Sequence, residues 1–315
     1  MNNPFKNYPF NRKWAKISLK DSPRCRISVS TKMGDLLVDW GDNSPIEKLV
    51  INKNVGLGFS TTGVITSKGD LTEINHDYSV NFTGDVKITS TAGLSDIYTI
   101  KINDWVRYIG LSGQNVVTRW NLDNTFLKQF PEIKYFHLGL YFYTGNAGYT
   151  AQSIRGDWSN IPDSLELLSF HSVNTSNVDK LHININNFPP TSKLKYLNIA
   201  NIDGSPTTTN SWTNVYGNLS NLPSGIVYFR NDAVLGSGYT YTGKIFPTNM
   251  ERFSFTQTAM SKDENDHLLN DLAVPSTWTG SQKIVSVTGS RSLNSDIAVN
   301  SLTSKTVTVT PSTAS

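Results

Sequence analysis

The sequence lacks several features that would point to particular classes of protein. Its 315 residues include a single cysteine, Cys25, so a disulfide within the chain and a cysteine-based metal site are both excluded. We expect a buried thiol that packs as a small hydrophobic group. No run of about 18 apolar residues occurs, so no segment is typical of a transmembrane helix. The first residues carry no apolar stretch of the secretory type, which predicts synthesis in the cytoplasm.

Charged side chains are also scarce, at 17% of the residues, and the formal net charge is only +3. Asn, Ser, Thr, Gly and aromatic residues are plentiful, which is typical of β-rich extracellular or virion proteins. One local excess of positive charge occurs near the N-terminus, and we favour a solvated strand face over a polyanion site for it. We therefore expect no nucleic-acid partner. That excess comprises Lys6, Arg12, Lys13, Lys16, Lys20, Arg24 and Arg26.

Motifs of known catalytic and cofactor sites are missing as well. The chain has no zinc-protease helix motif, phosphate-binding glycine loop, dinucleotide fingerprint or nucleophile elbow. Its five histidines show no metal-ligand spacing, although His137 and His171 should lie close together on the exposed face of adjacent strands. We expect a protein that is not an enzyme and carries no cofactor.

What the sequence does contain is a recurring set of apolar residues at positions 1, 4, 6 and 9 of a nine-residue stretch. Twenty-two of the 24 positions in six such rows are apolar, and successive rows start 24 to 36 residues apart. Because side chains alternate along a strand, positions 4 and 6 share a face, and stacked turns would form a parallel sheet over one apolar interior. A weaker seventh row begins at Ile284. The six rows are Ile97/Ile100/Ile102/Trp105, Ile133/Phe136/Leu138/Tyr141, Leu165/Leu168/Phe170/Val173, Leu194/Leu197/Ile199/Ile202, Ile226/Phe229/Asn231/Val234 and Met250/Phe253/Phe255/Thr258.

This spacing resembles the leucine-rich repeat, L-x-x-L-x-L, over about residues 93–315. The resemblance implies a solenoid. The chain departs from the family at position 9, where many such repeats carry a ladder of Asn; here residues such as Ile202 and Val234 predict closure by packing. The segments between rows are rich in Asn, Ser, Thr and Gly, and we expect extended loops there rather than helices.

The C-terminal region predicts a cap for the solenoid. Ser261 and Glu264 form a capping box, so a helix is expected over about 262–273. A strand from Ile284, a second helix around 292–302 and a last strand over 306–310 should follow. This ending resembles the terminal segment of irregular leucine-rich-repeat proteins from Bacteroidota and their phages.

The N-terminal region alternates in the manner of short antiparallel strands over residues 21–92. Val38-Asp39-Trp40-Gly41-Asp42-Asn43 and the later Ile74-Asn75-His76-Asp77-Tyr78 resemble the two motifs of the polycystic-kidney-disease (PKD-like) immunoglobulin-type sandwich. Trp40 should then fill the core, Gly41 permit a turn, and the two aspartates bind turn amides. Asn43 stands where the family usually has Gly, and a long insertion covers 53–68. Residues 1–20 should form an aromatic docking arm.

Two groups of residues are candidates for a site. Asp35, Asp39 and Asp42 could gather around Ca²⁺, although we favour turn capping. Two loops combine tyrosine with Gly, Ser, Thr and Asn, a composition that suits contacts with protein or glycan. The same loops could instead fold tightly with their rings against the sheet. The tyrosines are Tyr141, Tyr143, Tyr149, Tyr239 and Tyr241.

Together these features predict a mainly β protein with minor α content: an arm (1–20), a PKD-like β-sandwich (21–92) and an irregular leucine-rich-repeat solenoid with a helical cap (93–315). The resemblances imply a non-enzymatic structural protein of a phage virion, as in the crAss-like phages, that decorates a capsid or tail or forms a fibre. Its partners would be other virion proteins and a host-surface protein or glycan, within an oligomeric assembly. The alternative is a bacterial cell-surface leucine-rich-repeat adhesin or glycan-binding protein.

Overall fold

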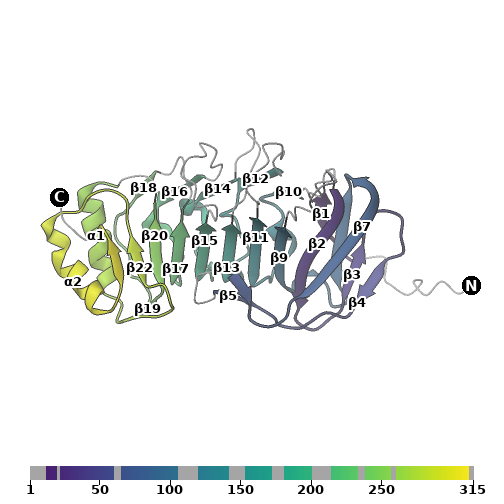
Figure 1. Cartoon of the computed structure of the whole chain (residues 1–315), viewed down its shortest axis with the longest axis horizontal. Coiled ribbons are helices and arrows are strands. Elements are labelled where there is room, and N and C mark those ends of the chain that lie inside the picture. The colour runs from purple at the N-terminus through teal and green to yellow at the C-terminus, as the bar shows by residue number, and fades with distance from the viewer. Residues whose placement is uncertain are drawn as a thin grey trace, which may run out of the picture.

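The computed structural model describes residues 12–19, 22–59, 65–105, 120–141, 153–171, 181–200, 214–232, 238–256 and 260–311. The chain is mainly β, with 44% strand and 16% helix, and a helical pair lies at its C-terminal end (Figure 1). Most strands belong to two large mixed sheets that contain parallel ladders.

The strands of each sheet have the following bounds and order. The nine-stranded sheet runs β18 (Tyr239–Thr240), β16 (Asn214–Asn218), β14 (Leu181–Asn184), β12 (Ser153–Asp157), β10 (Trp120–Asp123), β1 (Ala15–Leu19), β8 (Asp85–Ser90), β3 (Leu36–Asp39) and β4 (Glu47–Leu49). The ten-stranded sheet runs β23 (Thr308–Thr310), β22 (Ile284–Ser286), β20 (Arg252–Phe255), β17 (Tyr228–Asn231), β15 (Tyr196–Ala200), β13 (Leu167–His171), β11 (Tyr135–Tyr141), β9 (Ile97–Trp105), β2 (Ser22–Thr31) and β7 (Thr72–Phe82). Two small pairs are β5 (Leu57–Phe59) with β6 (Ile65–Ser67), and β19 (Asn249–Met250) with β21 (Thr277–Trp278). The helices are α1 (Lys262–Ala273) and α2 (Asp296–Ser304).

From β9 to β18 the chain alternates between the two large sheets. Odd-numbered strands join the ten-stranded sheet and even-numbered strands join the nine-stranded one, and neighbours within this region pair in parallel. Each turn of chain therefore adds one strand to each sheet. The prediction of extended loops between the rows was wrong in this respect, because the segments from β9 to β18 contain the second strand of each turn.

The predicted apolar interior is confirmed. Phe136, Leu168, Leu197, Phe229 and Phe253 occupy position 4 of successive rows, are register partners on neighbouring strands, and have no exposed surface. Their side chains belong to one apolar cluster that also includes residues of the nine-stranded sheet. At position 9, Val173, Ile202, Val234 and Thr258 lie outside the described residues, as do the side chains of Trp105 and Tyr141.

A ladder of polar side chains follows the even-numbered strands. An oxygen of each side chain accepts a hydrogen bond from the backbone N–H two residues later, at 2.8–3.1 Å. Asn187 Nδ2 also donates to Asp157 Oδ2 of the preceding turn at 2.7 Å, which ties successive turns together. A polar ladder therefore exists, on the second strand of the turn rather than at position 9. Its members are Asp123, Asp157, Asn184 and Asn218.

The N-terminal region continues the same two sheets. β1 lies between β8 and β10, antiparallel to both, and β2 lies between β7 and β9. One apolar cluster extends from Ala15 to Val309, so the expected boundary near residue 92 is not a break in the core. Residues 15–19 of the predicted arm lie on the chain's own domain, where they form the core strand β1. Residues 1–11 lie outside the described residues, and Cys25 is buried as expected.

The two N-terminal motifs contact each other, and Trp40 fills the core as predicted. Trp40 is buried, and its ring stacks on His76 at 4.7 Å between centroids. Tyr78 donates a hydrogen bond to the carbonyl of Trp40 at 3.2 Å. Gly41 has φ +76° and Asn43 has φ +67°, which explains why a glycine suits both positions.

The C-terminal cap also matches the prediction. The Ser261 side chain accepts from the Glu264 N–H and the Glu264 carboxylate accepts from the Ser261 N–H, which starts α1. Leu268, Leu269 and Leu272 are fully buried against the core cluster. In the described part of the chain, neither helix has the length and hydrophobicity needed to cross a bilayer.

Candidate functional site

The side chains of the ten-stranded sheet that point away from the core form its outer face. These side chains belong to repeat positions 3 and 5, because positions along a strand alternate between its two faces and positions 4 and 6 point into the core. Position 3, continued by register into β22 and β23, gives a row rich in tyrosine, here called the aromatic row: Thr99, Tyr135, Leu167, Tyr196, Tyr228, Arg252, Ile284 and Thr308. Because Val285 aligns with Phe253 at position 4, the seventh row begins at Gln282 and the expected start at Ile284 was wrong by two residues. Position 5 gives the polar row: Lys101, His137, Ser169, Asn198, Arg230, Ser254, Ser286 and Thr310.

The β5–β6 hairpin packs on the N-terminal part of the aromatic row. Leu57 and Ile65 form an apolar cluster with Leu167, and the ring of Phe59 stacks on Tyr228 at 4.2 Å. This hairpin is the insertion over 53–68. At its entry, a Cβ on Gly56 would stand 2.9 Å from the Tyr135 ring, so only glycine lets the backbone approach so closely.

The polar row is buried at its centre, which corrects the expectation of two exposed histidines. His137 and His171 do lie near each other, with ring centroids 6.4 Å apart, but His137 has no exposed surface. His137 Nδ1 lies 3.0 Å from Ser169 Oγ, which also accepts from Asn198 Nδ2 at 3.1 Å. Burial lowers the pKa of His137 well below its usual value, and burial followed by the nearby charge of Arg230 lowers the pKa of His171 to about 4. Both rings are therefore neutral at pH 7.

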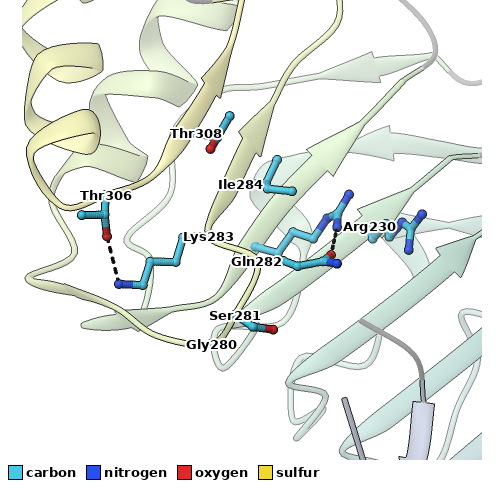
Figure 2. A pocket seen from close by; sticks show the side chains of 9 residues that line it. Arg230, Gly280, Ser281, Gln282, Lys283, Ile284, Thr306 and Thr308 are labelled. Carbon is cyan, nitrogen blue, oxygen red and sulfur yellow. Dashed lines mark hydrogen bonds between the residues drawn. The ribbon is translucent and has the colours of Figure 1, made fainter. Parts of the chain in front are cut away.

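Toward the C-terminal end, the outer face opens into a pocket of about 630 Å³ (Figure 2). Two arginines on adjacent strands, Arg230 of β17 and Arg252 of β20, line it together with Lys283, which precedes β22. We call this the basic pocket. Its other lining residues are Gly280, Ser281, Gln282, Ile284, Thr306 and Thr308.

The cations of the basic pocket differ in their partners. Arg230 Nε donates to Asp232 Oδ2 at 2.5 Å, in an ion pair that is mostly buried. Lys283 Nζ donates to Thr306 Oγ1 at 3.1 Å, as Figure 2 shows. Arg252 is buried, and its hydrogen bonds go to neutral oxygens: Nε to Ser254 Oγ at 2.7 Å and one terminal nitrogen to Gln282 Oε1 at 2.6 Å.

The sequence did not single out these three cations. Arg230 and Arg252 occupy positions 5 and 3 of their rows, whereas the candidate contact residues lie in loops rich in tyrosine and glycine. Because positions 3 and 5 point to the same outward face, their residue types predict two arginines on that face of neighbouring strands. Lys283 could have been added as the residue immediately before Ile284.

None of the candidate tyrosines that the structure describes is among the residues that line the basic pocket. Tyr239 and Tyr241 are buried rather than exposed, so the tucked arrangement describes them. The Tyr239 hydroxyl accepts from Asn231 Nδ2 at 2.6 Å, and the Tyr241 hydroxyl donates to Asp271 Oδ2 at 2.6 Å. Tyr143 and Tyr149 lie outside the described residues, as does the side chain of Tyr141.

The three aspartates of the calcium candidate are bound separately. Asp39 and Asp42 accept from the backbone N–H groups of Gly41 and Ser44 at 3.0 and 3.1 Å, which is the turn-capping role. Asp35 pairs with Lys48 and Lys53. Within the described ranges, no group of three His, Cys, Asp or Glu side chains is arranged to hold a metal ion.

Comparison of the chain with family models, with curated proteins and with solved structures gave no match.

Proposed function

We propose that this chain is a non-enzymatic contact protein that presents the outer face of its ten-stranded sheet to a partner. In this proposal, β9 to β23 form a leucine-rich-repeat solenoid and the N-terminal strands form a PKD-like sandwich. The observation that supports it best is the outer face itself. One part is covered by the β5–β6 hairpin, and another part is open and basic. Stacked-repeat proteins use such extended sheet faces for binding.

The proposed setting is a phage virion, as a decoration or fibre-type component of the capsid or tail. It rests on the resemblances in the sequence and on a fold suited to packing against neighbours. Mass spectrometry of purified particles from the source should detect the chain in a fixed ratio to the major structural proteins. Particles that lack the chain would contradict this setting.

The alternative setting is the surface of a bacterium, where the chain would be an adhesin or glycan-binding protein. The basic pocket favours this reading, because an open site with hydroxyl, amide and cationic groups suits a surface ligand. Fractionation of the source cells distinguishes the two settings. Recovery with the cell envelope, in the absence of particles, would support the adhesin.

A further inference from the structure

We propose that the basic pocket binds the carboxylate of an acidic sugar, with Arg252 as its central ligand and Arg230 and Lys283 beside it. This inference deepens the proposed contact function and rests on it for its biological meaning. The two strands that carry the arginines are neighbours in the ladder, and both side chains line the same open space.

Arg252 is the central residue because its positive charge is buried and forms no ion pair of its own. The nearby carboxylate of Asp232 acts on this charge, but its direct ion pair is with Arg230. The residue is 9% exposed, and its side chain donates hydrogen bonds to Ser254 and Gln282, both neutral, while the neutral Tyr228 lies beside it. Burying a charge without pairing it costs free energy, so this guanidinium should favour an anion. The planar fork of an arginine matches the two oxygens of a carboxylate.

The charges around the pocket point the same way. Among the described lining residues there are three cations and no carboxylate. Asp232 pairs with Arg230, and Glu251, which lies beside Gly280, accepts a hydrogen bond from the Tyr196 hydroxyl at 3.0 Å. Neither carboxylate forms an ion pair with Arg252 or Lys283.

The neutral lining indicates what surrounds the carboxylate in the ligand. Ser281, Thr306 and Thr308 provide hydroxyls and Gln282 provides an amide, whereas Ile284 is the single large apolar residue of the lining. Such groups pair with sugar hydroxyls. The volume of about 630 Å³ lies within the range of small-ligand pockets and exceeds what an inorganic anion needs.

Calorimetric titration of the full chain tests this assignment. The probes are a disaccharide ending in glucuronate, its counterpart ending in glucose, and inorganic phosphate. The variants are Arg252→Met, which keeps the apolar stem, and Lys283→Gln. Lys128→Gln makes the same charge change at an exposed residue of the turn after β10 and serves as the control. Thermal unfolding checks that each variant is folded.

We expect the glucuronate probe to bind, and the glucose probe to bind at least about tenfold more weakly. Arg252→Met should weaken glucuronate binding by about tenfold or more and Lys283→Gln by a smaller factor, while Lys128→Gln leaves it unchanged. If Arg252→Met does not fold, Lys283→Gln decides the outcome.

Equal binding of the acidic and neutral sugars, or no effect of the folded pocket variants, would overturn the assignment. Phosphate that binds as tightly as glucuronate would overturn the choice of an acidic sugar. If the chain is found in particles but does not bind glucuronate, the pocket inference fails while the contact function stands. If glucuronate binds but the chain is found neither in particles nor at a cell surface, the pocket inference stands and the proposed contact function fails.

Discussion

At the scale of single residues, Asn231 shows how a buried polar side chain is accommodated in the repeat. It occupies an inward position 6, where the other rows have Ile, Leu or Phe, and it has no exposed surface. Tyr239 supplies the hydrogen-bond partner from the strand β18. A buried amide without such a partner would be costly, so the two residues depend on each other.

Removal of the Tyr239 hydroxyl tests this dependence. Tyr239→Phe should lower the free energy of unfolding by about 1–2 kcal/mol, because the Asn231 amide loses a buried acceptor. The measurement is urea unfolding. Tyr216→Phe is the control, since it removes the same hydroxyl from a half-buried tyrosine whose ring lies 6.3 Å from that of His182 and away from Asn231 in the repeat. Equal stability of Tyr239→Phe and the parent chain would contradict the account.

The buried histidines predict a dependence of stability on pH. His137 and His171 have lowered pKa values in the folded chain, so the unfolded chain binds more protons below about pH 6.5. The contribution of the two histidines to the free energy of unfolding should therefore be fully present above that pH and decrease as the pH falls toward 4. For His171, a folded pKa of about 4 corresponds to a loss of up to about 2 kcal/mol at pH 5.

Unfolding of the parent chain and of His171→Gln at pH 7.5 and pH 5 measures this effect. The variant should lose less stability between the two pH values than the parent chain. His182→Gln, which replaces a half-buried histidine of β14, is the matched control. A parent chain and a His171→Gln variant with the same loss would show that His171 is not the titrating group.

At the scale of elements, the β5–β6 hairpin connects the N-terminal strands to the parallel array. Phe59 contacts both Tyr196 and Tyr228, at 5.4 and 4.2 Å between ring centroids. The backbone around the hairpin is held as well, because Ser30 Oγ donates to the Val55 carbonyl at 2.8 Å. The hairpin therefore belongs to the outer face rather than to a separate loop.

Phe59→Ala should lower the free energy of unfolding by about 1–3 kcal/mol, less than for a fully buried ring because Phe59 is half-buried. Urea unfolding gives the value, and Val50→Ala, at a side chain that is 80% exposed, is the control. An unchanged stability for Phe59→Ala would mean that the hairpin contributes little to holding the face together.

The sequence predicted the elements whose apolar spacing is regular and missed those without it. Leu168 and Phe170 predict their strand and its inward face because two large apolar residues alternate there. Strands such as β14 have only Leu181 and Ile183 within a polar segment, which is too short a signal to distinguish from a loop. The basic pocket was not predictable from loop composition, since Arg230 and Arg252 are 22 residues apart in sequence and meet through strand pairing.

At the scale of the whole molecule, one apolar interior serves both regions that the sequence distinguishes. Ala15 and Ile17 of β1 belong to the same cluster as Leu168 of β13 and Val309 of β23. The two large sheets likewise continue across residue 92 through the pairs β1–β10 and β2–β9. The N-terminal strands thus close one end of the stack, as the two helices close the other (Figure 1).

Calorimetric unfolding of the full chain, with and without Leu168→Ala, tests this shared interior most directly. Removing a fully buried leucine should cost about 2–5 kcal/mol. A shared interior predicts one transition, which the substitution shifts as a whole to lower temperature. Two separate transitions, of which Leu168→Ala shifts only one, would contradict a shared interior.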